Sequence, residues 1–145
     1  MCGTITPSAG KSVRVCSTHL ESGKPDVKEV LEAVDVRRRQ ASELAKHLKS
    51  YDADLLVLGG DMNSPLRGVD PTRLAYEWGG FHDVHDSMPW ADRGTAPDEA
   101  KGKVSVPLDM IYVDKKDVGG NVGVCSDDAC VGWSDHVPIY AELDI

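Results

Sequence analysis

Six polar residues, spread over four short strings of the sequence, have the side chains best suited to chemistry. They are His19, Asp61, Asn63, Asp109, Asp135 and His136. Each lies at or near the end of an apolar run, where a strand would present it at the rim of a sheet. Carboxylates and amides are ligands that hard cations prefer, and imidazoles move protons near neutral pH. Metal-assisted cleavage of a phosphate ester needs this combination of groups.

Asp61 and Asn63 follow two glycines at the end of an entirely apolar run. If the extended conformation continues past the run, residues two apart point to the same side. A carboxylate beside an amide then suits a cation and a phosphate oxygen. Asp and Asn near glycine are also common turn formers, so a simple turn is the competing interpretation of this string.

Asp135 and His136 are adjacent, so in an extended segment their side chains point to opposite sides. One could then reach a metal ion while the other reaches the reacting water. A histidine at a phosphate site can act as a general base or acid. A helix cap or a turn built on Ser134 and Asp135 is the alternative.

Asp109 lies inside an apolar run, between Leu108 and Met110. An unpaired buried carboxylate is costly, so Asp109 must face solvent or have a partner. A nearby imidazole is the natural candidate, because a carboxylate can orient a histidine ring and fix its tautomer. His19 lies at the end of another predicted strand, and by itself it would be interpreted as a structural histidine.

The elements that must position these residues follow from hydrophobic periodicity. The predicted elements are a strand over 13–20, an amphipathic helix over 27–49, a strand over 55–59, a weaker helix over 66–79, and strands over 81–84, 108–113, 122–125 and 137–143. The polar stretch 92–106, rich in Gly, Pro and Lys, is expected to be a mobile loop. This order indicates a mixed α/β sheet with helices on at least one side.

Length and charge limit the class of protein. The chain has 145 residues, 41% of them hydrophobic and 28% charged, which suits one globular domain. Its net charge of -8 argues against a passive nucleic-acid-binding module, which normally has a basic face. It says little against a metal enzyme, because bound cations reverse the local charge. No apolar run is long enough to span a membrane, and residues 1–10 do not resemble a signal peptide.

Four cysteines leave the redox state open. Cys2, Cys16, Cys125 and Cys130 allow two disulfides in three connectivities, or four unrelated thiols. Cys125 and Cys130 could close a small loop just before the Ser-Asp-His string. Disulfides would mean that the protein matures in an oxidising compartment, and they allow a secreted parent protein. The localisation is otherwise unknown from the sequence.

The strings, in this order and in these strand contexts, resemble the endonuclease/exonuclease/phosphatase superfamily. That superfamily includes DNase I-like nucleases, abasic-site endonucleases, inositol-phosphate phosphatases and sphingomyelinases. The matching features run from about residue 13 to the C-terminus. They are Thr18-His19-Leu20, Arg37 and Gln40 on the following helix, Gly60-Asp61-Met62-Asn63, Gly80-Phe81 with Asp83, Leu108-Asp109-Met110-Ile111-Tyr112, and Ser134-Asp135-His136-Val137-Pro138.

The resemblance implies roles for the six polar residues. The implied catalytic residues are His19, Asp61, Asn63, Asp109 and His136. Asp135 and Asp61 would bind Mg²⁺, or Mn²⁺ in its place. His136 would be the general base or stabilise the transition state, oriented by Asp109, and His19 would donate to the phosphate or the leaving group. The implied reaction is hydrolysis of a phosphodiester or phosphomonoester by in-line attack of water, with nucleic acid among the candidate substrates.

The chain departs from the family at its N-terminal end. Family members carry an earlier half that supplies an Asn, the main metal-binding Glu and an acidic partner for the first His, and residues 1–12 contain none of these motifs. We therefore interpret residues 1–145 as one domain that lacks this half. The expected fold is a mixed β-sheet flanked by helices, resembling half of the four-layer α/β sandwich of DNase I-like proteins. One face of its sheet would be bare, and an apolar patch of that size requires a partner.

Three hypotheses follow from this departure. In the first, the chain is a truncated or split hydrolase that is slow or inactive alone. In the second, it is a non-catalytic half-fold that pairs its open sheet face with itself, as a homodimer, or with another chain such as the missing half. In the third, it is a complete enzyme whose metal site uses other carboxylates, such as Asp83 and Asp86.

Overall fold

The computed structural model describes residues 1–7, 10–22, 27–64, 70–98, 103–116, 119–125, 130 and 134–144. Along these residues the elements are β1 (Cys2–Ile5), β2 (Val13–His19), α1 (Val27–Lys49), β3 (Leu55–Asp61), α2 (Pro71–Trp78), β4 (His82–Asp83), a 3₁₀ turn (Trp90–Asp92), β5 (Ala96–Asp98), β6 (Lys103–Val106), β7 (Asp109–Val113), β8 (Gly119–Val124) and β9 (Ile139–Leu143).

The central element is a five-stranded mixed sheet in the order β1-β2-β3-β7-β4. β2 and β3 are parallel and α1 connects them, whereas the other neighbouring strands pair antiparallel. A parallel pair needs such a crossover, because a short hairpin cannot reverse the chain twice. β5 pairs with β6 and β8 with β9 in two separate antiparallel pairs. The predicted mixed α/β architecture is therefore confirmed.

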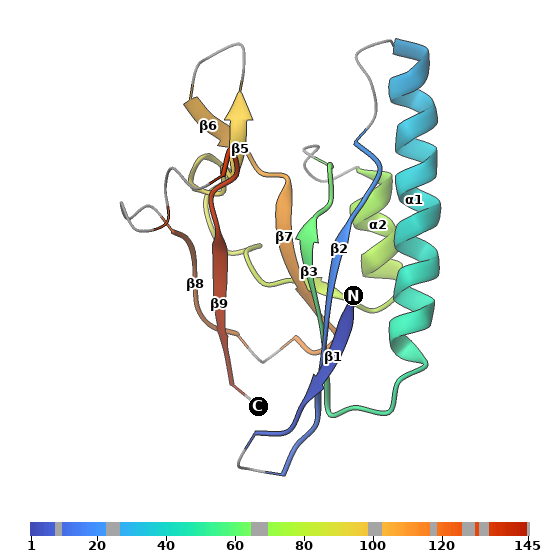
Figure 1. The fold of residues 1–145 in the computed structure, drawn as a ribbon, viewed down its shortest axis with the longest axis vertical. Helices are drawn as coiled ribbons and strands as arrows, with labels where there is room; N and C mark the ends of the chain where they lie inside the picture. The colour runs from blue at the N-terminus through green and yellow to red at the C-terminus, as the bar shows by residue number, and fades with distance from the viewer. Residues whose placement is uncertain are drawn as a thin grey trace.

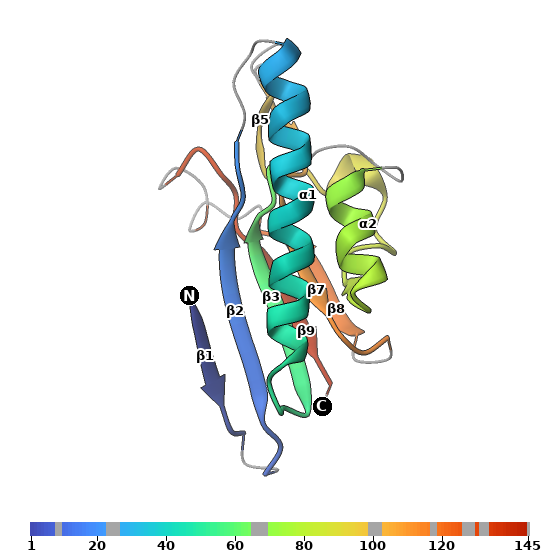
Figure 2. The same cartoon turned by 90° about the vertical axis from the view of Figure 1, so that its right-hand side faces the viewer.

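The molecule is layered, as two perpendicular views show (Figures 1 and 2). Helices α1 and α2 cover one face of the central sheet, and the β8–β9 pair lies against the opposite face. Alternate strand residues point to opposite faces, so each strand contributes to both layers. The helix-covered face holds the larger buried cluster, which includes Cys16, Leu56, Leu58, Met110 and Tyr112 of the sheet with Ala41, Ala45 and Leu48 of α1 and Tyr76 of α2.

The helices follow their sequence signals. The apolar stripe predicted a helix over 27–49, and α1 has those bounds. The second helix begins at Pro71, later than predicted, because the Asp70 side chain caps it by accepting a hydrogen bond from the Thr72 N–H. Proline favours the first helical position, which makes the start sharp. Residues 66–69, the first part of the predicted helix, lie outside the described residues.

The expected mobile loop over 92–106 is wrong in its described part. β5 and β6 form an antiparallel pair there, with Ala96 opposite Val106 and Asp98 opposite Lys103. The Thr95 N–H donates to the Val106 carbonyl at 3.0 Å and continues the pairing. Hydrogen bonds between backbone groups can hold two strands together whether or not apolar residues alternate along them. This stretch lacks such an alternation, and its composition therefore suggested a loop. β1 was not predicted either, because it is a short edge strand with little apolar pattern.

Both cysteine pairs are disulfides: Cys2 with Cys16, and Cys125 with Cys130. The first joins edge strand β1 to β2, and the second closes the small loop that the sequence suggested. The interpretation as four unrelated thiols is wrong. Two disulfides are compatible with an extracellular protein. Among the described residues, no helix has the length and apolar character that crossing a membrane requires.

Strand directions bring the polar strings to one end of the sheet. β2 and β3 end at the top of Figure 1, where β7 and β9 begin. The parallel pairing of β2 with β3 and the antiparallel pairing of β3 with β7 set this arrangement. Residues at the end of two strands and at the start of two others therefore share one rim.

Candidate active site

Three of the predicted site residues form a row across the rim of the sheet. His19 of β2 is opposite Asp61 of β3, and Asp61 is opposite Asp109 of β7. Strand pairing therefore places three residues that are 42 and 48 positions apart in sequence side by side. His136 comes from the bend just before β9. The row and His136 together supply two carboxylates and two imidazoles, and Asp135 of the bend adds a third carboxylate beside them.

His136 bridges the two carboxylates. Its Nδ1 lies 2.7 Å from Asp109 Oδ2, and its Nε2 lies 4.0 Å from Asp61 Oδ2. A carboxylate can only accept a hydrogen bond, so the Nδ1 atom carries the hydrogen in this pair. The Nε2 atom is then left facing Asp61, where it can accept or donate a proton. Of the two alternatives for Asp109, solvent or a partner, the structure therefore shows the imidazole partner.

The pKa of His136 is raised above its ordinary value. Partial burial lowers the pKa of His136, but the hydrogen bond that its Nδ1–H donates to Asp109 and the charge of Asp109 raise it, and the charges of Asp61 and Asp135 add to this. The imidazolium is favoured because three carboxylates surround it. The ring is only partly exposed, at 29% of its side-chain surface, so solvent screens these charges incompletely.

Asp61 is shared by both histidines. Its Oδ2 lies 3.4 Å from His19 Nε2, while its side chain is only 15% exposed. The pKa of Asp61 is raised above its ordinary value. Burial is the largest cause, and the charge of Asp109 also raises it. The hydrogen bond from the Asn63 N–H and the charges of the two histidines act in the opposite direction. A carboxylate with a raised pKa between two imidazoles is typical of functional sites.

Asn63 is in a turn. Its φ is 48°, so the extended conformation that would aim Asp61 and Asn63 to the same side does not continue past the strand. The Asn63 N–H donates to Asp61 Oδ1 at 2.8 Å, and its Nδ2 donates to the Leu20 carbonyl at 2.9 Å. The turn interpretation is therefore right for the backbone. The same turn also keeps Asn63 against Asp61 and the end of β2.

Asp135, the second predicted metal ligand, is exposed beside the site. The Ser134 hydroxyl donates to its Oδ1 at 3.3 Å, and the His136 N–H donates to the Ser134 oxygen at 3.1 Å. These two bonds shape the bend that carries His136. Asp135 is close enough for its charge to raise the pKa of His136.

Residues outside the rim hold the segment that follows His19. Arg37, which is 7% exposed, donates from Nη1 to the Glu21 carbonyl at 2.9 Å. The Gln40 side-chain oxygen accepts from the Glu21 N–H at 3.1 Å. The sequence named both residues only as part of the family resemblance, without saying what they contact. Their contacts are with backbone, which no side-chain pattern reveals.

Thr95 was missed entirely by the sequence analysis. It is fully buried, and its hydroxyl oxygen accepts hydrogen bonds from the Leu108 and Asp109 N–H groups, both at 3.1 Å. Its carbonyl accepts from the Val137 N–H at 2.7 Å. The only possible signal was a β-branched residue within a stretch that composition marked as a loop.

The structure does not support a metal site at Asp83 and Asp86. Arg93 Nη1 lies 3.3 Å from Asp83 Oδ2, and Arg73 Nη2 donates to Asp86 Oδ1 at 2.9 Å. His85 completes the buried group, with its Nδ1 3.7 Å from Asp83 Oδ1. The guanidinium groups neutralise these carboxylates, as in a structural ion-pair network.

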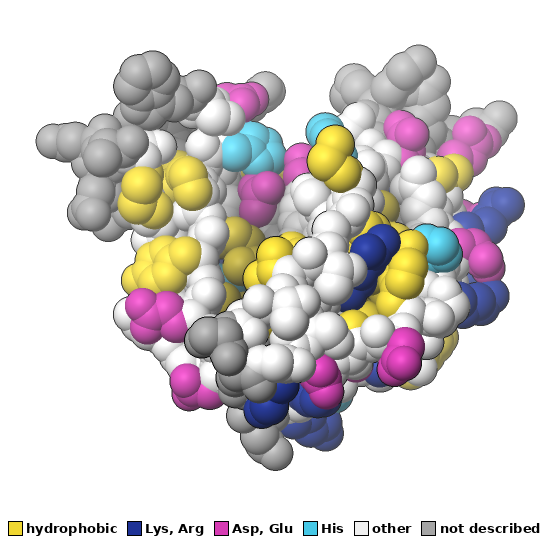
Figure 3. All heavy atoms as spheres, turned by 60° about the horizontal axis from the view of Figure 1, so that its bottom comes forward, with side chains coloured by type: hydrophobic (Ala, Val, Ile, Leu, Met, Phe, Trp, Pro, Cys, Tyr) yellow, Lys and Arg dark blue, Asp and Glu magenta, His cyan; other side chains and the backbone are white. Residues whose placement is uncertain are grey.

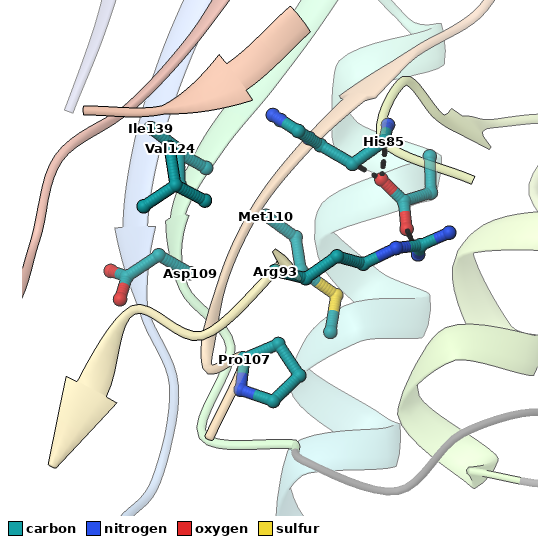
Figure 4. A pocket seen from close by; sticks show the side chains of 8 residues that line it. His85, Arg93, Pro107, Asp109, Met110, Val124 and Ile139 are labelled. Atoms are coloured by element: carbon teal, nitrogen blue, oxygen red, sulfur yellow. Dashed lines mark hydrogen bonds and ion pairs between the residues drawn. The ribbon is translucent and has the colours of Figure 1, made fainter. Parts of the chain in front are cut away.

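A cavity of about 10 Å³, room for about one water molecule, separates this buried group from the candidate site. Figure 4 shows the Asp109 carboxylate pointing away from the Arg93 guanidinium across this cavity. Arg93 therefore does not neutralise Asp109, and Asp109 remains available to His136.

The rim residues do not form a closed metal cage. Among the described residues, no three His, Cys, Asp or Glu side chains are arranged around a common point that could hold a metal ion. Mg²⁺ does not need such a cage, because it keeps several waters and is bound through one or two carboxylates plus substrate phosphates. Asp61 and Asp135 are carboxylates of the required kind, so the donor chemistry fits Mg²⁺ held in this open way.

An open groove of about 380 Å³ runs from the site along the sheet face that the helices do not cover. Its lining residues are Gly59, Gly60, Asp109, Ile111, Ser134, His136, Val137, Pro138 and Ile139. Figure 3 shows the surface hollowed between two parts of the molecule, with hydrophobic side chains in the hollow. One end of the groove therefore reaches the catalytic candidates while its length is largely apolar.

Sequence comparison leaves the family open. No family model matches the chain, and no curated protein matches it in sequence. Comparison of the fold does find matches. TDP2 from D. rerio, complexed with a single-stranded DNA product, matches with a TM-score of 0.72 at 20% identity, over 99% of this chain and 60% of that one. The 3′ phosphatase NExo from Neisseria, bound to a product DNA hairpin, matches with a TM-score of 0.70 at 17% identity, over 99% of this chain and 65% of that one.

Beta toxin from Staphylococcus aureus, in a form with bound magnesium ions, matches with a TM-score of 0.61 at 22% identity, over 96% of this chain and 55% of that one. Other matches carry the name of the endonuclease/exonuclease/phosphatase family. This chain has the fold of the endonuclease/exonuclease/phosphatase superfamily. It spans less than two thirds of the length of these superfamily structures.

Proposed function

We propose that this chain is the catalytic C-terminal part of a divalent-metal-dependent phosphoester hydrolase of the phosphodiesterase or nuclease type. The observation that carries the proposal is the continuous series of contacts from Asp109 through His136 and Asp61 to His19. Acids and imidazoles from four separate segments meet at one rim, on a fold shared with phosphoester hydrolases.

In this proposal His136 moves the proton of the attacking water or stabilises charge on the phosphoryl group. Asp109 accepts the Nδ1 hydrogen, which fixes the ring and leaves Nε2 for the reaction. When neutral, Nε2 can take a proton from water, and when protonated it can donate to a phosphate oxygen. The raised pKa keeps a larger imidazolium fraction near neutral pH than an isolated histidine would have.

His19 and Asn63 would also contact the phosphate. His19 is largely exposed, with 70% of its side-chain surface accessible, so a substrate can reach its ring. Its Nε2 faces Asp61, which can hold the ring in place until a phosphate oxygen or leaving group replaces that contact. Asn63, tied to the end of β2, places an amide beside the same carboxylate.

The proposal includes Mg²⁺, or Mn²⁺ in its place, bound by Asp61 and Asp135. The bound ion would polarise the phosphoryl oxygen and orient the substrate. The magnesium ions in beta toxin support this assignment by likeness of fold. The negative charge of the chain is compatible with it, because a cation reverses the local charge at the site.

We also propose that the open sheet face requires a covering surface. The groove beside the site is largely apolar and open, and Val15 on the same face is 39% exposed. An N-terminal half of the superfamily domain is the first candidate, since this chain covers only 55 to 65% of the length of the TDP2, NExo and beta toxin structures. A second copy of the chain is the other candidate. The two disulfides favour a parent protein that is secreted.

The same groove supports an alternative function, a non-catalytic half-fold that pairs through its open face. Hydrolysis of bis(4-nitrophenyl) phosphate separates the two, measured with Mg²⁺, Mn²⁺ or a chelator, with and without an added N-terminal half from a superfamily member. We expect turnover that needs the metal and rises when the half is added. No turnover in any of these mixtures, together with a stable dimer in sedimentation, would favour the non-catalytic module.

Matched substitutions then test the site itself. Asp61→Ala and His136→Ala should each lower turnover by about 10²-fold to 10⁴-fold. Asp52→Ala and His47→Ala are the controls, because both side chains are exposed and lie outside the candidate site. Thermal unfolding of all four variants checks that each is folded. Activity that survives both site substitutions would remove the assignment.

A further inference from the structure

We infer that Thr95 is a positioning residue that sets the alignment of Asp109 with His136; the inference rests on the proposed function for its catalytic meaning. Thr95 contacts neither of these side chains in its own hydrogen bonds. It acts through the backbone of the two segments that carry them. Its position just before β5 makes it the point where those segments meet.

The hydroxyl of Thr95 fixes the start of β7. Its oxygen accepts from the Leu108 and Asp109 N–H groups, each at 3.1 Å, and it lies 3.5 Å from the Val106 carbonyl. A hydroxyl has two acceptor positions and one donor. Both acceptor positions of the Thr95 hydroxyl are therefore used, one by the N–H of Asp109 and one by the N–H of Leu108.

The backbone of Thr95 fixes the bend that carries His136. The Thr95 carbonyl accepts from the Val137 N–H at 2.7 Å, the residue directly after His136. The Thr95 N–H donates to the Val106 carbonyl at 3.0 Å, which anchors Thr95 itself to β6. One buried residue thus holds both partners of the 2.7 Å contact between His136 and Asp109.

This arrangement matters because the two partners come from different sheets. Asp109 begins β7 of the central sheet, while His136 precedes β9 of the separate β8–β9 pair. Regular strand pairing therefore cannot set the distance between them. Small errors in such a distance are costly, since a misplacement of about 1 Å can lower a rate by about 10²-fold.

Thr95→Val tests the inference, because it keeps the shape and removes the hydroxyl. We expect kcat to fall by about 10-fold to 10²-fold with KM changed by less than about twofold. Thr95→Ser restores the hydroxyl and should return kcat to within about threefold of the wild type. Thr72→Val is the matched control: Thr72 is also buried, its hydroxyl has no hydrogen-bond partner among the residues that the structure describes, and it lies in α2 away from the site.

A second readout does not depend on turnover. In the metal-free protein the His136 Nδ1 hydrogen should give a protected NMR resonance in the wild type, in Thr95→Ser and in Thr72→Val, and lose protection in Thr95→Val. If Thr95→Val keeps that resonance and full kcat, the inference is wrong. If the wild type hydrolyses no phosphoester but the resonance still follows the hydroxyl, Thr95 positions the pair and only the proposed function fails.

A third measurement needs no variant and covers the case in which Thr95→Val does not fold. Native-state hydrogen exchange reports local opening at each amide. Because Asp109 and Val137 are held by the same residue, their N–H groups should open together and show equal protection in the wild type. A Val137 amide that exchanges more than about tenfold faster than that of Asp109 would overturn the inference.

Discussion

The two faces of the central sheet are built from the same strands but differ in burial and in the residues that they carry. Toward the helices, Leu58 and Tyr112 are almost completely buried in one apolar cluster with α1 and α2. Toward the β8–β9 pair, Val57 and Val113 belong to a smaller buried cluster. Asp61 and Asp109 lie beyond that cluster, at the rim of the same two strands. The helix face is closed, and the opposite face is partly open.

This difference separates stability from chemistry within each strand. Residues one apart along β3 or β7 point to opposite faces, so a core residue and a site residue can be neighbours in sequence. The closed face supplies most of the apolar burial that favours folding. The open face leaves acids and imidazoles accessible to solvent. Substitutions on the two faces should therefore have different consequences, and three predictions test this.

The largest effect is expected at two adjacent glycines. A Cβ on Gly60, whose φ is 141°, would lie 1.9 Å from the Thr18 carbonyl oxygen, whereas a Cβ on Gly59 would meet ordinary contacts at 3.8 Å and beyond. Gly60→Ala should lower the free energy of unfolding by more than about 4 kcal/mol, and Gly59→Ala by less than about 1. Urea denaturation measures both. Equal losses would mean that the β2–β3 approach at Thr18 is not as close as described.

The next effect compares a buried residue with an exposed one. Phe81 is fully buried in the helix-side cluster, while Val15 on the open face is 39% exposed. Phe81→Ala should lower the free energy of unfolding by about 3 to 5 kcal/mol, and Val15→Ala by about 0.5 or less in the isolated chain. If Val15→Ala becomes costly at high protein concentration, the open face is an interface between copies of the chain.

The smallest effect concerns pH at the open face. The pKa of His136 is raised in the folded state, so its charged form adds stability below about pH 6.5 that is lost as pH rises through the folded pKa. Asp109→Asn keeps the shape and removes the charge, so the pKa of His136 should fall. In the metal-free protein the substitution should cost roughly 1 kcal/mol more at about pH 5.5 than at about pH 9.

Denaturation at the two pH values checks this, with Asp52→Asn as the control on an exposed acid that lies outside the site. An NMR titration of the His136 ring supplies the direction independently. If Asp109→Asn lowers the free energy of unfolding equally at both pH values, and the pKa of His136 does not fall, the contact with Asp109 does not stabilise the charged form of His136.

Much of the fold followed from periodicity. The stripe ending in Ala45 and Leu48 predicted α1, and the apolar run from Leu55 predicted β3. These signals are strong because burial of a helix stripe or a strand repeats at a fixed period. The β5–β6 pair was missed because its strands have only three and four residues, too few to leave an apolar period in the sequence. The strand predicted over 137–143 begins later, at Ile139, since the bend carrying His136 precedes it.

The site was predictable as residue types and only partly as geometry. Asp109 inside an apolar strand had to face solvent or have a partner, and the sequence named an imidazole as the natural partner; the structure shows that it is His136. The assumption of an extended segment through Asn63 was wrong, because the turn there favours a left-handed conformation. The catalytic and metal-binding roles of these residues remain predictions.

The sequence by itself determined which groups are present and that strand ends would present them, because side-chain chemistry and hydrophobic period are local properties. Only the tertiary structure decided that β2, β3 and β7 align His19, Asp61 and Asp109 in one row, since register is set by pairing between distant strands. It alone also decided that Thr95 joins the two sheets, because its hydroxyl and its carbonyl accept from the N–H groups of Asp109 and Val137, and backbone N–H groups leave no signal in the sequence.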